Sequence, residues 1–222
     1  SLAIWDMLFG DSNAQAYTAA NSYEQAQICF REIKNVLKGL DPKLKSFKLN
    51  RERIEFVNQK KADRSSFIRC LASDPDTLDG LNASTVIMDE YSQADSADLY
   101  NVLTSSMGVR ENPLTIIITT ASDKNEAPFV SDLNYNKNVL LHEIGMSEKV
   151  NDRMFAHIFQ PDIDDAEDDP HTWAKVQPHL GITIQKDYYD LEYKKALESI
   201  DKMKEFRTKQ LNIFVSGNDK PW

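Results

Sequence analysis

The order of apolar and polar residues divides the chain into short segments with two kinds of spacing. Residues 2–9 are apolar enough for a buried helix that stops at Gly10. Ser22 and Gln25 have the spacing of a capping box, which predicts a helix from Ser22 to about Gly39. The apolar residues of this helix recur at helical spacing, so one buried face is expected to hold Ala26, Cys29, Phe30, Ile33, Val36 and Leu37.

Shorter runs with alternating or β-branched residues predict strands. Residues 15–20 and 67–72 are strand candidates, and residues 46–58 alternate like a β-hairpin that turns near 50–52. Two further runs, 84–90 and 114–121, are almost continuously apolar.

Strands that are apolar on both faces lie in the middle of a parallel sheet that helices cover on both sides. We therefore expect residues 84–90 and 114–121 in the middle of such a sheet. A helix over residues 95–108 joins them into a strand–helix–strand unit. The first half of the chain is thus predicted to be an α/β domain.

After residue 127 the pattern becomes mainly helical. We expect a helix over 128–143, an extended piece at 153–159, and one long amphipathic helix that starts near Asp187. The apolar face of that long helix is expected to hold Leu191, Ala196, Leu197, Ile200, Met203 and Phe206. The predicted domains are an incomplete α/β core at 1–127 and a helical linker region at 128–222.

Composition narrows the class of protein. A chain of 222 residues with 41% hydrophobic residues can bury one good-sized core. No apolar run approaches the ~18–20 residues of a membrane helix and no signal peptide is evident, so we expect a cytoplasmic protein. Cys29 and Cys70 are expected as reduced thiols, and the four histidines lack zinc spacing.

Charge argues against a protein that binds nucleic acid by coating phosphates with a basic face. The formal net charge is −9, whereas binders of that kind carry a basic stripe. A ring whose DNA contacts lie in a few loops is still compatible. Six acidic residues crowd one stretch, where a solvated loop is expected and a metal site is the alternative. They are Asp162, Asp164, Asp165, Glu167, Asp168 and Asp169.

Polar residues follow each of the two apolar strands, where parallel sheets bind their ligands. Asp89 and Glu90 follow Val86–Met88, which is the pattern of a Walker B motif with an adjacent catalytic glutamate. Asp89 would hold Mg²⁺ at the nucleotide phosphates and Glu90 would polarise the attacking water. Thr119 and Thr120 end the other run and could donate a hydrogen bond to a γ-phosphate. Strand termination, helix capping and the β-propensity of threonine are the structural alternatives.

Several segments, in the same order, resemble the large terminase subunits of tailed phages and prophages. They are LAIWDMLFG (2–10), AYTAANSYEQAQICF (16–30), DGLNAS before VIMDE (79–90), MGVR before NPLTIIITTAS (107–122), Trp173 with Gln177-Pro178 and Leu180-Gly181, and FRTKQLNIFV (206–215). The last segment resembles the helix that ends the ATPase region of these proteins. The resemblance spans essentially the whole chain.

The resemblance implies a P-loop NTPase-like fold of the additional-strand, catalytic-glutamate type. It implies a motor that hydrolyses ATP with Mg²⁺ to move double-stranded viral DNA into a capsid, with the portal protein and the small terminase subunit as partners. In the family a separate nuclease domain cuts the DNA, and the motor works as a ring in the bacterial cytoplasm.

The resemblance also assigns roles to individual residues. By motif position Asp89 is the Walker B aspartate, and Glu90 is the catalytic glutamate. Thr119, Thr120 and Ala121 form the motif that couples hydrolysis to movement. Arg110 is a phosphate-sensing or trans-acting arginine, with a surface arginine as the alternative.

One family motif is absent. None of the seven glycines is followed by lysine, so the G-x-x-x-x-G-K-[ST] loop that cradles phosphates is missing. In the family this loop precedes the segment that resembles residues 2–9, and the nuclease domain starts near residues 218–222. We therefore expect a fragment whose sheet lacks its first strand, which binds MgATP weakly or not at all and is inactive alone. A partner copy could fill the gap in the sheet, so a homo-oligomer is an alternative.

Three other functions stay open at the level of sequence. The chain could be a truncated helicase-like P-loop ATPase, although the Trp173 segment and the closing helix argue against it. It could be a non-enzymatic α/β scaffold in which Asp89 and Glu90 are structural. A nucleic-acid-binding module is disfavoured by the acidic balance.

Overall fold

The computed structural model describes residues 1–57, 65–71 and 80–215. The chain forms two compact units, Ser1–Thr119 and Thr120–Trp222, where the sequence predicted a boundary at residue 127. Residues 218–222, near which we expected a nuclease domain to start, lie outside the described residues. In the described part of the chain no helix is long and apolar enough to cross a membrane.

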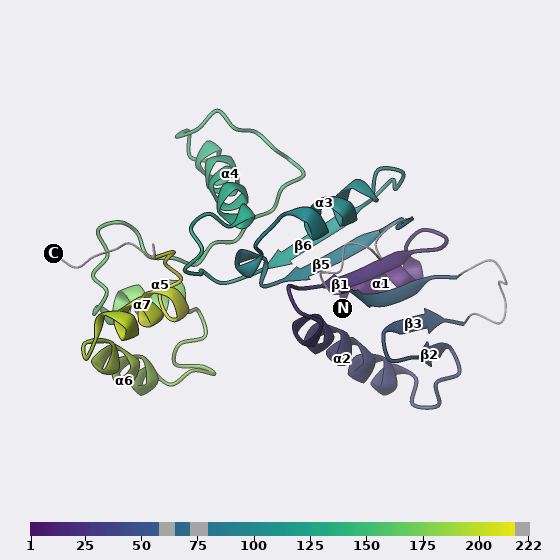
Figure 1. Ribbon diagram of the computed structural model, residues 1–222, viewed down its shortest axis with the longest axis horizontal. Helices are drawn as coiled ribbons and strands as arrows, with labels where there is room; N and C mark the ends of the chain where they lie inside the picture. The colour runs from purple at the N-terminus through teal and green to yellow at the C-terminus, as the bar shows by residue number, and fades with distance from the viewer. Residues whose placement is uncertain (58–64, 72–79, 216–222) are drawn as a thin grey trace. The chain divides into compact units, whose positions relative to one another are not determined.

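The first unit is built on a six-stranded sheet with the strand order β2-β3-β4-β1-β5-β6 (Figure 1). The strands are β1 (Gln15–Ala19), β2 (Phe47–Leu49), β3 (Arg53–Phe56), β4 (Phe67–Leu71), β5 (Thr85–Asp89) and β6 (Leu114–Ile118). Strands β4, β1, β5 and β6 are parallel, whereas β3 is antiparallel to β4 and β2 is antiparallel to β3. The α/β class is confirmed, and the sheet is mixed because the β2-β3 hairpin extends the parallel part.

One face of the sheet packs against α1 (Leu2–Phe9) and α2 (Tyr23–Leu40). The parallel register pairs Ala16 with Ile68, and both side chains belong to the core that also contains Phe30 of α2. Both cysteines are free thiols, as expected, and Cys70 is part of this core. Burial of these side chains on one face fixes the register, since a slip by one residue would turn them to the other face.

Helix α2 begins where the sequence predicts and ends slightly later. The Ser22 hydroxyl accepts a hydrogen bond from the Gln25 N–H at 3.2 Å, which is the expected N-terminal cap. The helix passes through Gly39 and ends at Leu40, so Gly39 is not the exit. Val36 was expected on the buried face but is 50% exposed, because only a narrower face of the helix reaches the sheet.

Strand β6 is the outermost strand of the sheet, and the expectation that residues 114–121 lie in its middle is wrong. Only its inner edge pairs with a described strand, β5, so its side chains are half exposed and Ile118 is 58% exposed. Helix α3 (Asp98–Ser105) connects β5 to β6, after a short 3-10 turn (η2) at Tyr91–Gln93. The predicted helix over 95–108 is therefore shorter than expected.

The second unit is helical. Its helices are α4 (Pro128–His142), α5 (Pro170–Val176), α6 (Lys186–Ala196) and α7 (Ile200–Lys209). Residues 153–159, expected to be extended, have no regular secondary structure. The last helix ends at Lys209, so most of the segment 206–215 is not helical.

The single long helix predicted from Asp187 is wrong, since the chain breaks between α6 and α7. Ser199 ends the break by accepting a hydrogen bond from the Lys202 N–H at 3.3 Å. Leu197 and Ile200, expected on a buried face, are 63% and 52% exposed at this turn. The apolar core of this region is formed instead by Trp173, Val176, Tyr189, Ala196, Phe206 and Leu211.

Three of the six acidic residues in the stretch 162–169 pair with basic side chains. The Lys175 amine lies 2.7 Å from the Asp162 carboxylate and 2.5 Å from that of Asp165. Arg207 pairs with Glu167 at 2.8 Å. Among the described residues no group of acidic, histidine and cysteine side chains could hold a metal by itself.

Candidate active site

Asp89 and Glu90 lie at the carboxyl end of β5, and the backbone turns sharply between them and η2. Asp89 is the last residue of the strand and pairs with Ile118 of β6. Glu90 has a left-handed backbone, with φ of 51°. This conformation is unfavourable for a glutamate and occurs mostly at turns and functional sites.

Hydrogen bonds from two neighbouring strands hold the Glu90 backbone. Its N–H donates to the Ile118 carbonyl at 2.8 Å. The side-chain amide of Asn21, which follows β1, donates to the Glu90 carbonyl at 3.0 Å. The carboxyl ends of β1, β5 and β6 therefore jointly set the direction in which the chain leaves β5.

Thr119 lies beside this turn. It follows the last residue of β6, and its hydroxyl accepts a hydrogen bond from the Ser92 N–H at 3.0 Å. Ser92 is only two residues after Glu90, so Thr119 is tied directly to the turn that carries the two carboxylates. Asp89, Glu90 and Thr119 thus share one edge of the sheet, as the sequence predicts for parallel strands.

The N-terminus of α1 points toward the same edge. The hydroxyls of Ser84 and Thr85, at the start of β5, donate to the Asp6 carboxylate at 2.7 and 2.8 Å. This contact places the C-terminal half of α1 beside the beginning of β5. Helix α1 therefore runs opposite to β5, and its first turn lies toward the end of the strand.

Asp89 also lies near a thiol on α2, that of Cys29. Burial raises the pKa of the Cys29 thiol, and the Asp89 carboxylate raises it further. The positive end of a helix dipole, with its unpaired N–H groups, favours anions such as phosphate at this edge.

The structure does not bring Arg110 to this edge. Its guanidinium donates to the backbone carbonyls of Asn13 at 2.9 Å and Asn82 at 2.7 Å. These residues precede β1 and β5, so Arg110 lies at the amino ends of the strands. It connects the loops before β1 and β5 through these two hydrogen bonds.

Thr120 and Ala121 belong to the second unit. Thr120 is exposed, whereas Ala121 is buried and its N–H donates to the side-chain oxygen of Asn212 at 2.6 Å. The predicted group of site residues is therefore divided between the two units. Asp89, Glu90 and Thr119 form the part that the first unit brings together.

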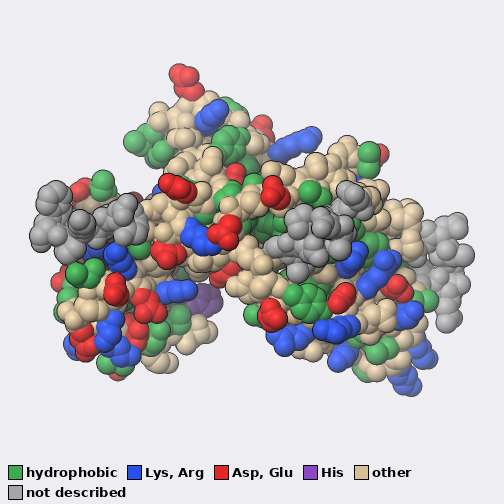
Figure 2. Space-filling model, viewed as in Figure 1, with side chains coloured by type: hydrophobic (Ala, Val, Ile, Leu, Met, Phe, Trp, Pro, Cys, Tyr) green, Lys and Arg blue, Asp and Glu red, His purple; other side chains and the backbone are tan. Residues whose placement is uncertain are grey.

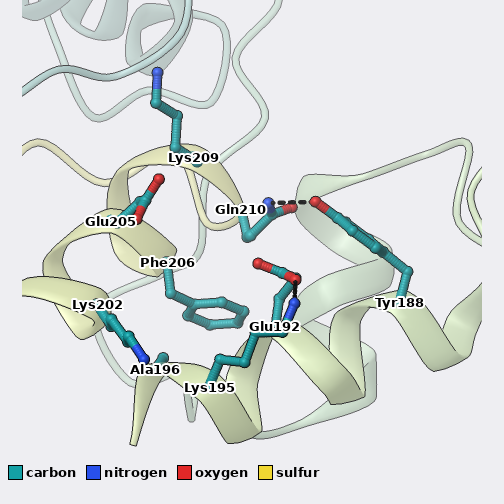
Figure 3. Close-up of a pocket in the computed structure, with 9 residues that line it drawn as sticks. All are labelled: Tyr188, Glu192, Lys195, Ala196, Lys202, Glu205, Phe206, Lys209 and Gln210. Carbon is teal, nitrogen blue, oxygen red and sulfur yellow. Dashed lines mark hydrogen bonds and ion pairs between the residues drawn. The ribbon is translucent and has the colours of Figure 1, made fainter. Parts of the chain in front are cut away.

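A separate pocket of about 380 Å³ lies between α6 and α7 and contains none of the predicted site residues (Figure 3). Its walls carry Tyr188, Glu192, Lys195, Ala196, Lys202, Glu205, Phe206, Lys209 and Gln210. Lys195 pairs with Glu192 at 2.7 Å, and the Gln210 amide donates to the Tyr188 hydroxyl at 3.2 Å. These contacts satisfy much of the polar lining within the pocket itself.

Sequence reasoning missed Asn21, Ser92 and Asn212. Asn21 had a signal that could have been used, because it is a polar residue directly after the apolar strand β1. The same rule that selected Asp89 and Thr119 applies to it. Ser92 contributes a backbone N–H, and Asn212 comes from a distant part of the sequence, so neither could be found by strand pattern.

Comparisons with known proteins agree with this geometry. The family described as "Terminase large subunit, ATPase domain" matches residues 2–138. The Escherichia coli K12 protein YmfN is 29% identical over 139 residues, which cover 63% of this chain and 30% of YmfN. The chain therefore spans less than a third of that relative.

Two solved structures share the fold. The large terminase of bacteriophage HK97 superposes with a TM-score of 0.72 at 22% identity, over 96% of this chain and 43% of its own. A mutant ATPase domain of the Thermus phage P74-26 large terminase gives a TM-score of 0.57 at 20% identity, over 96% of this chain and 81% of its own. The chain thus shares its fold with solved large terminases.

Proposed function

Because this chain belongs to the family of terminase large subunits and matches their ATPase domain, we propose that it carries the hydrolysis residues of an ATP-driven DNA-packaging motor. The observation that supports this most directly is the arrangement at one sheet edge. Asp89, Glu90 and Thr119 meet there, and the contacts of Asp6 with the start of β5 direct the N-terminus of α1 to the same edge.

The residues at this edge fit a magnesium nucleotide. Asp89 offers one carboxylate, which suits Mg²⁺, since this ion is usually held by one or two carboxylates together with substrate phosphates and water. When bound, the ion would neutralise charge that develops on the phosphates. The first-turn N–H groups of α1, which has no acidic residue in that turn, would face the phosphates.

Glu90 would act as the general base that orients and polarises the attacking water. Its backbone is fixed by Asn21 and Ile118, so its carboxylate is directed from a rigid turn. Thr119 would position this turn relative to the end of β6 through its bond to Ser92. Thr120 and Ala121 would complete the coupling motif in the second unit.

Arg110 has a different proposed role. Since it lies at the opposite ends of the strands, we assign it to bracing the loops at Asn13 and Asn82. A trans-acting role toward a neighbouring subunit remains a hypothesis.

The phosphate-binding lysine must come from elsewhere in this proposal, because none of the seven glycines is followed by lysine. The greater length of YmfN and of the HK97 terminase supports a longer parent protein. Residues 1–222 alone are then expected to hydrolyse ATP poorly.

Double-stranded DNA is the proposed cargo, with the portal protein and the small terminase subunit as further partners of the parent. Lys and Arg side chains gather over the part of the first unit that holds α2 and the β2-β3 hairpin (Figure 2). The basic residues from α2 to the β2-β3 turn include Arg31, Lys34, Lys38, Lys43, Lys45, Lys48 and Arg51. A local basic surface on an acidic chain suits phosphate contacts that are confined to a few elements.

The test is Mg²⁺-dependent ATP hydrolysis by the full-length parent protein and its Glu90→Gln variant. Removing a general base should lower kcat by about 100-fold or more. Glu111→Gln, which makes the same change at an exposed glutamate of the first unit, serves as the control and should leave kcat unchanged. Equal rates for the wild type and Glu90→Gln would instead favour the α/β scaffold.

A further inference from the structure

The side chain of Asn212, which follows α7, forms a hydrogen bond with the chain segment after β6. The Ala121 N–H donates to the Asn212 Oδ1 at 2.6 Å, and the Asn212 Nδ2 donates to the Phe159 carbonyl at 2.8 Å. All three residues belong to the second unit. Ala121 is 1% exposed, so its N–H has no access to water and depends on this partner.

The backbone of Asn212 is held in the conformation that this contact requires. Its φ is 56°, in the left-handed region, where asparagine is tolerated better than most side chains. The preceding Leu211 is fully buried in the core, and the Ile213 N–H donates to the Arg207 carbonyl at 2.9 Å. The position of Asn212 is therefore fixed by the packing of α7.

Asparagine is the residue type that this position needs. The side chain accepts a hydrogen bond from Ala121 and donates one to Phe159, and the asparagine amide offers both an acceptor and a donor. Aspartate could accept but could not donate. Glycine could adopt the backbone conformation without strain but would leave both partners unpaired.

We propose that Asn212 is a positioning residue that fixes the coupling segment Thr119–Ser122 and passes its movements to α7. The inference rests on the proposed function. Thr119 is bonded to Ser92 beside Glu90, and Ala121, two residues later, is bonded to Asn212. A shift of Thr119 on hydrolysis would thus reach Ala121, a buried residue that Asn212 holds at the end of α7.

The experiment uses the full-length parent protein and its Asn212→Gly variant. ATP hydrolysis and the amount of DNA that capsids protect from nuclease are measured in parallel. We expect hydrolysis to stay within about threefold of wild type, while the DNA packaged per ATP falls by about tenfold or more, the range of a typical coupling between sites. Asn212→Asp, which keeps the acceptor for Ala121, should retain more packaging than Asn212→Gly.

Asn13→Gly is the matched control. Asn13 also has a left-handed backbone, with φ of 60°, and its side chain accepts hydrogen bonds from Ser65. The same chemical change at Asn13 should leave the DNA packaged per ATP unchanged. Normal packaging by Asn212→Gly would overturn the proposal. So would a parallel loss of hydrolysis and packaging, because that pattern indicates a purely structural role.

Amide hydrogen exchange of residues 1–222 separates this inference from the proposed function. Asn212→Gly should speed exchange of the Ala121 N–H by about tenfold, as expected for one lost hydrogen bond. Asn13→Gly should not change it. A wild-type parent without ATPase activity would overturn the proposed function and the coupling role together, and unchanged exchange at Ala121 would overturn the anchoring itself.

Discussion

Glu90 is the residue whose geometry departs most from ordinary local preference. A left-handed glutamate costs about 1–3 kcal/mol unless its surroundings hold it in place. Here the N–H of Gln93 donates to the Glu90 carbonyl at 3.0 Å, in addition to the contacts from Asn21 and Ile118. Backbone strain of this kind is typical of functional sites, where the orientation of a side chain matters more than local stability.

Gly10 and Gly39 offer a matched test of local packing. A Cβ at Gly10 would lie 2.2 Å from the Asp6 Oδ1 and 2.5 Å from the Asp6 carbonyl oxygen. The Asp6 side chain cannot easily move, since Ser84 and Thr85 hold its other oxygen. Gly10→Ala should therefore lower the free energy of unfolding by roughly 1–3 kcal/mol.

Gly39→Ala is expected to change the free energy of unfolding in the opposite direction. Nothing lies within 4 Å of a Cβ at Gly39, which is inside α2. Alanine there should raise the free energy of unfolding by about 0.5–1 kcal/mol, because glycine has the lower helix propensity. Denaturant titration of both variants measures the two changes, and equal values would contradict the packing argument.

At the scale of elements, caps decide where the helices begin. Ser22 and Ser199 each accept a hydrogen bond from the N–H three residues later. The second cap divides the apolar pattern after Asp187 into α6 and α7. Helix α5 begins in a similar way, where Asp169 accepts from the His171 N–H at 2.8 Å and Pro170 occupies the first helical position.

Loss of the Ser199 cap should weaken the second unit. Ser199→Ala is expected to lower the free energy of unfolding by about 1 kcal/mol, since one N–H of the first turn of α7 loses its partner. Ser105→Ala is the control, because this exposed hydroxyl donates to the Val102 carbonyl of its own helix at 3.0 Å and caps no helix. Thermal or denaturant unfolding followed by tryptophan fluorescence, which includes Trp173 beside α6, provides the measurement.

At the scale of the whole molecule, net charge and local charge have opposite signs. The chain carries a net charge of −9, yet basic side chains gather around α2 and the β2-β3 hairpin. The acidic excess is partly neutralised within the second unit by Lys175 and Arg207. A negative net charge therefore does not exclude DNA contacts on one part of the first unit.

Salt dependence of DNA binding by the parent protein tests this distribution. A triple change of the exposed Lys38, Lys43 and Lys45 to Gln should weaken binding and reduce the slope of log K against log salt by roughly two to three. The control is the same change at Lys186, Lys194 and Lys209, which are exposed on α6 and α7. If both triple variants bind alike, the basic surface is not the contact.

The sequence by itself determined the α/β class, most of the strands and helices, and the edge that carries Asp89, Glu90 and Thr119. These features follow from local periodicity, from capping residues and from the rule that parallel strands end together. The wrong predictions of buried residues also come from local spacing. Val36, Leu197 and Ile200 have suitable spacing, but only tertiary packing decides which apolar residues find a partner.

Only the tertiary structure decided the remaining features, because they depend on residues far apart in sequence. Strand order placed β6 at the edge of the sheet. The fold also put Arg110 at the ends of the strands opposite to Asp89. It brought Asn212 to Ala121, a contact across 91 positions that no local pattern encodes. Local patterns specify elements, whereas hydrogen bonds between distant segments specify how a site is held.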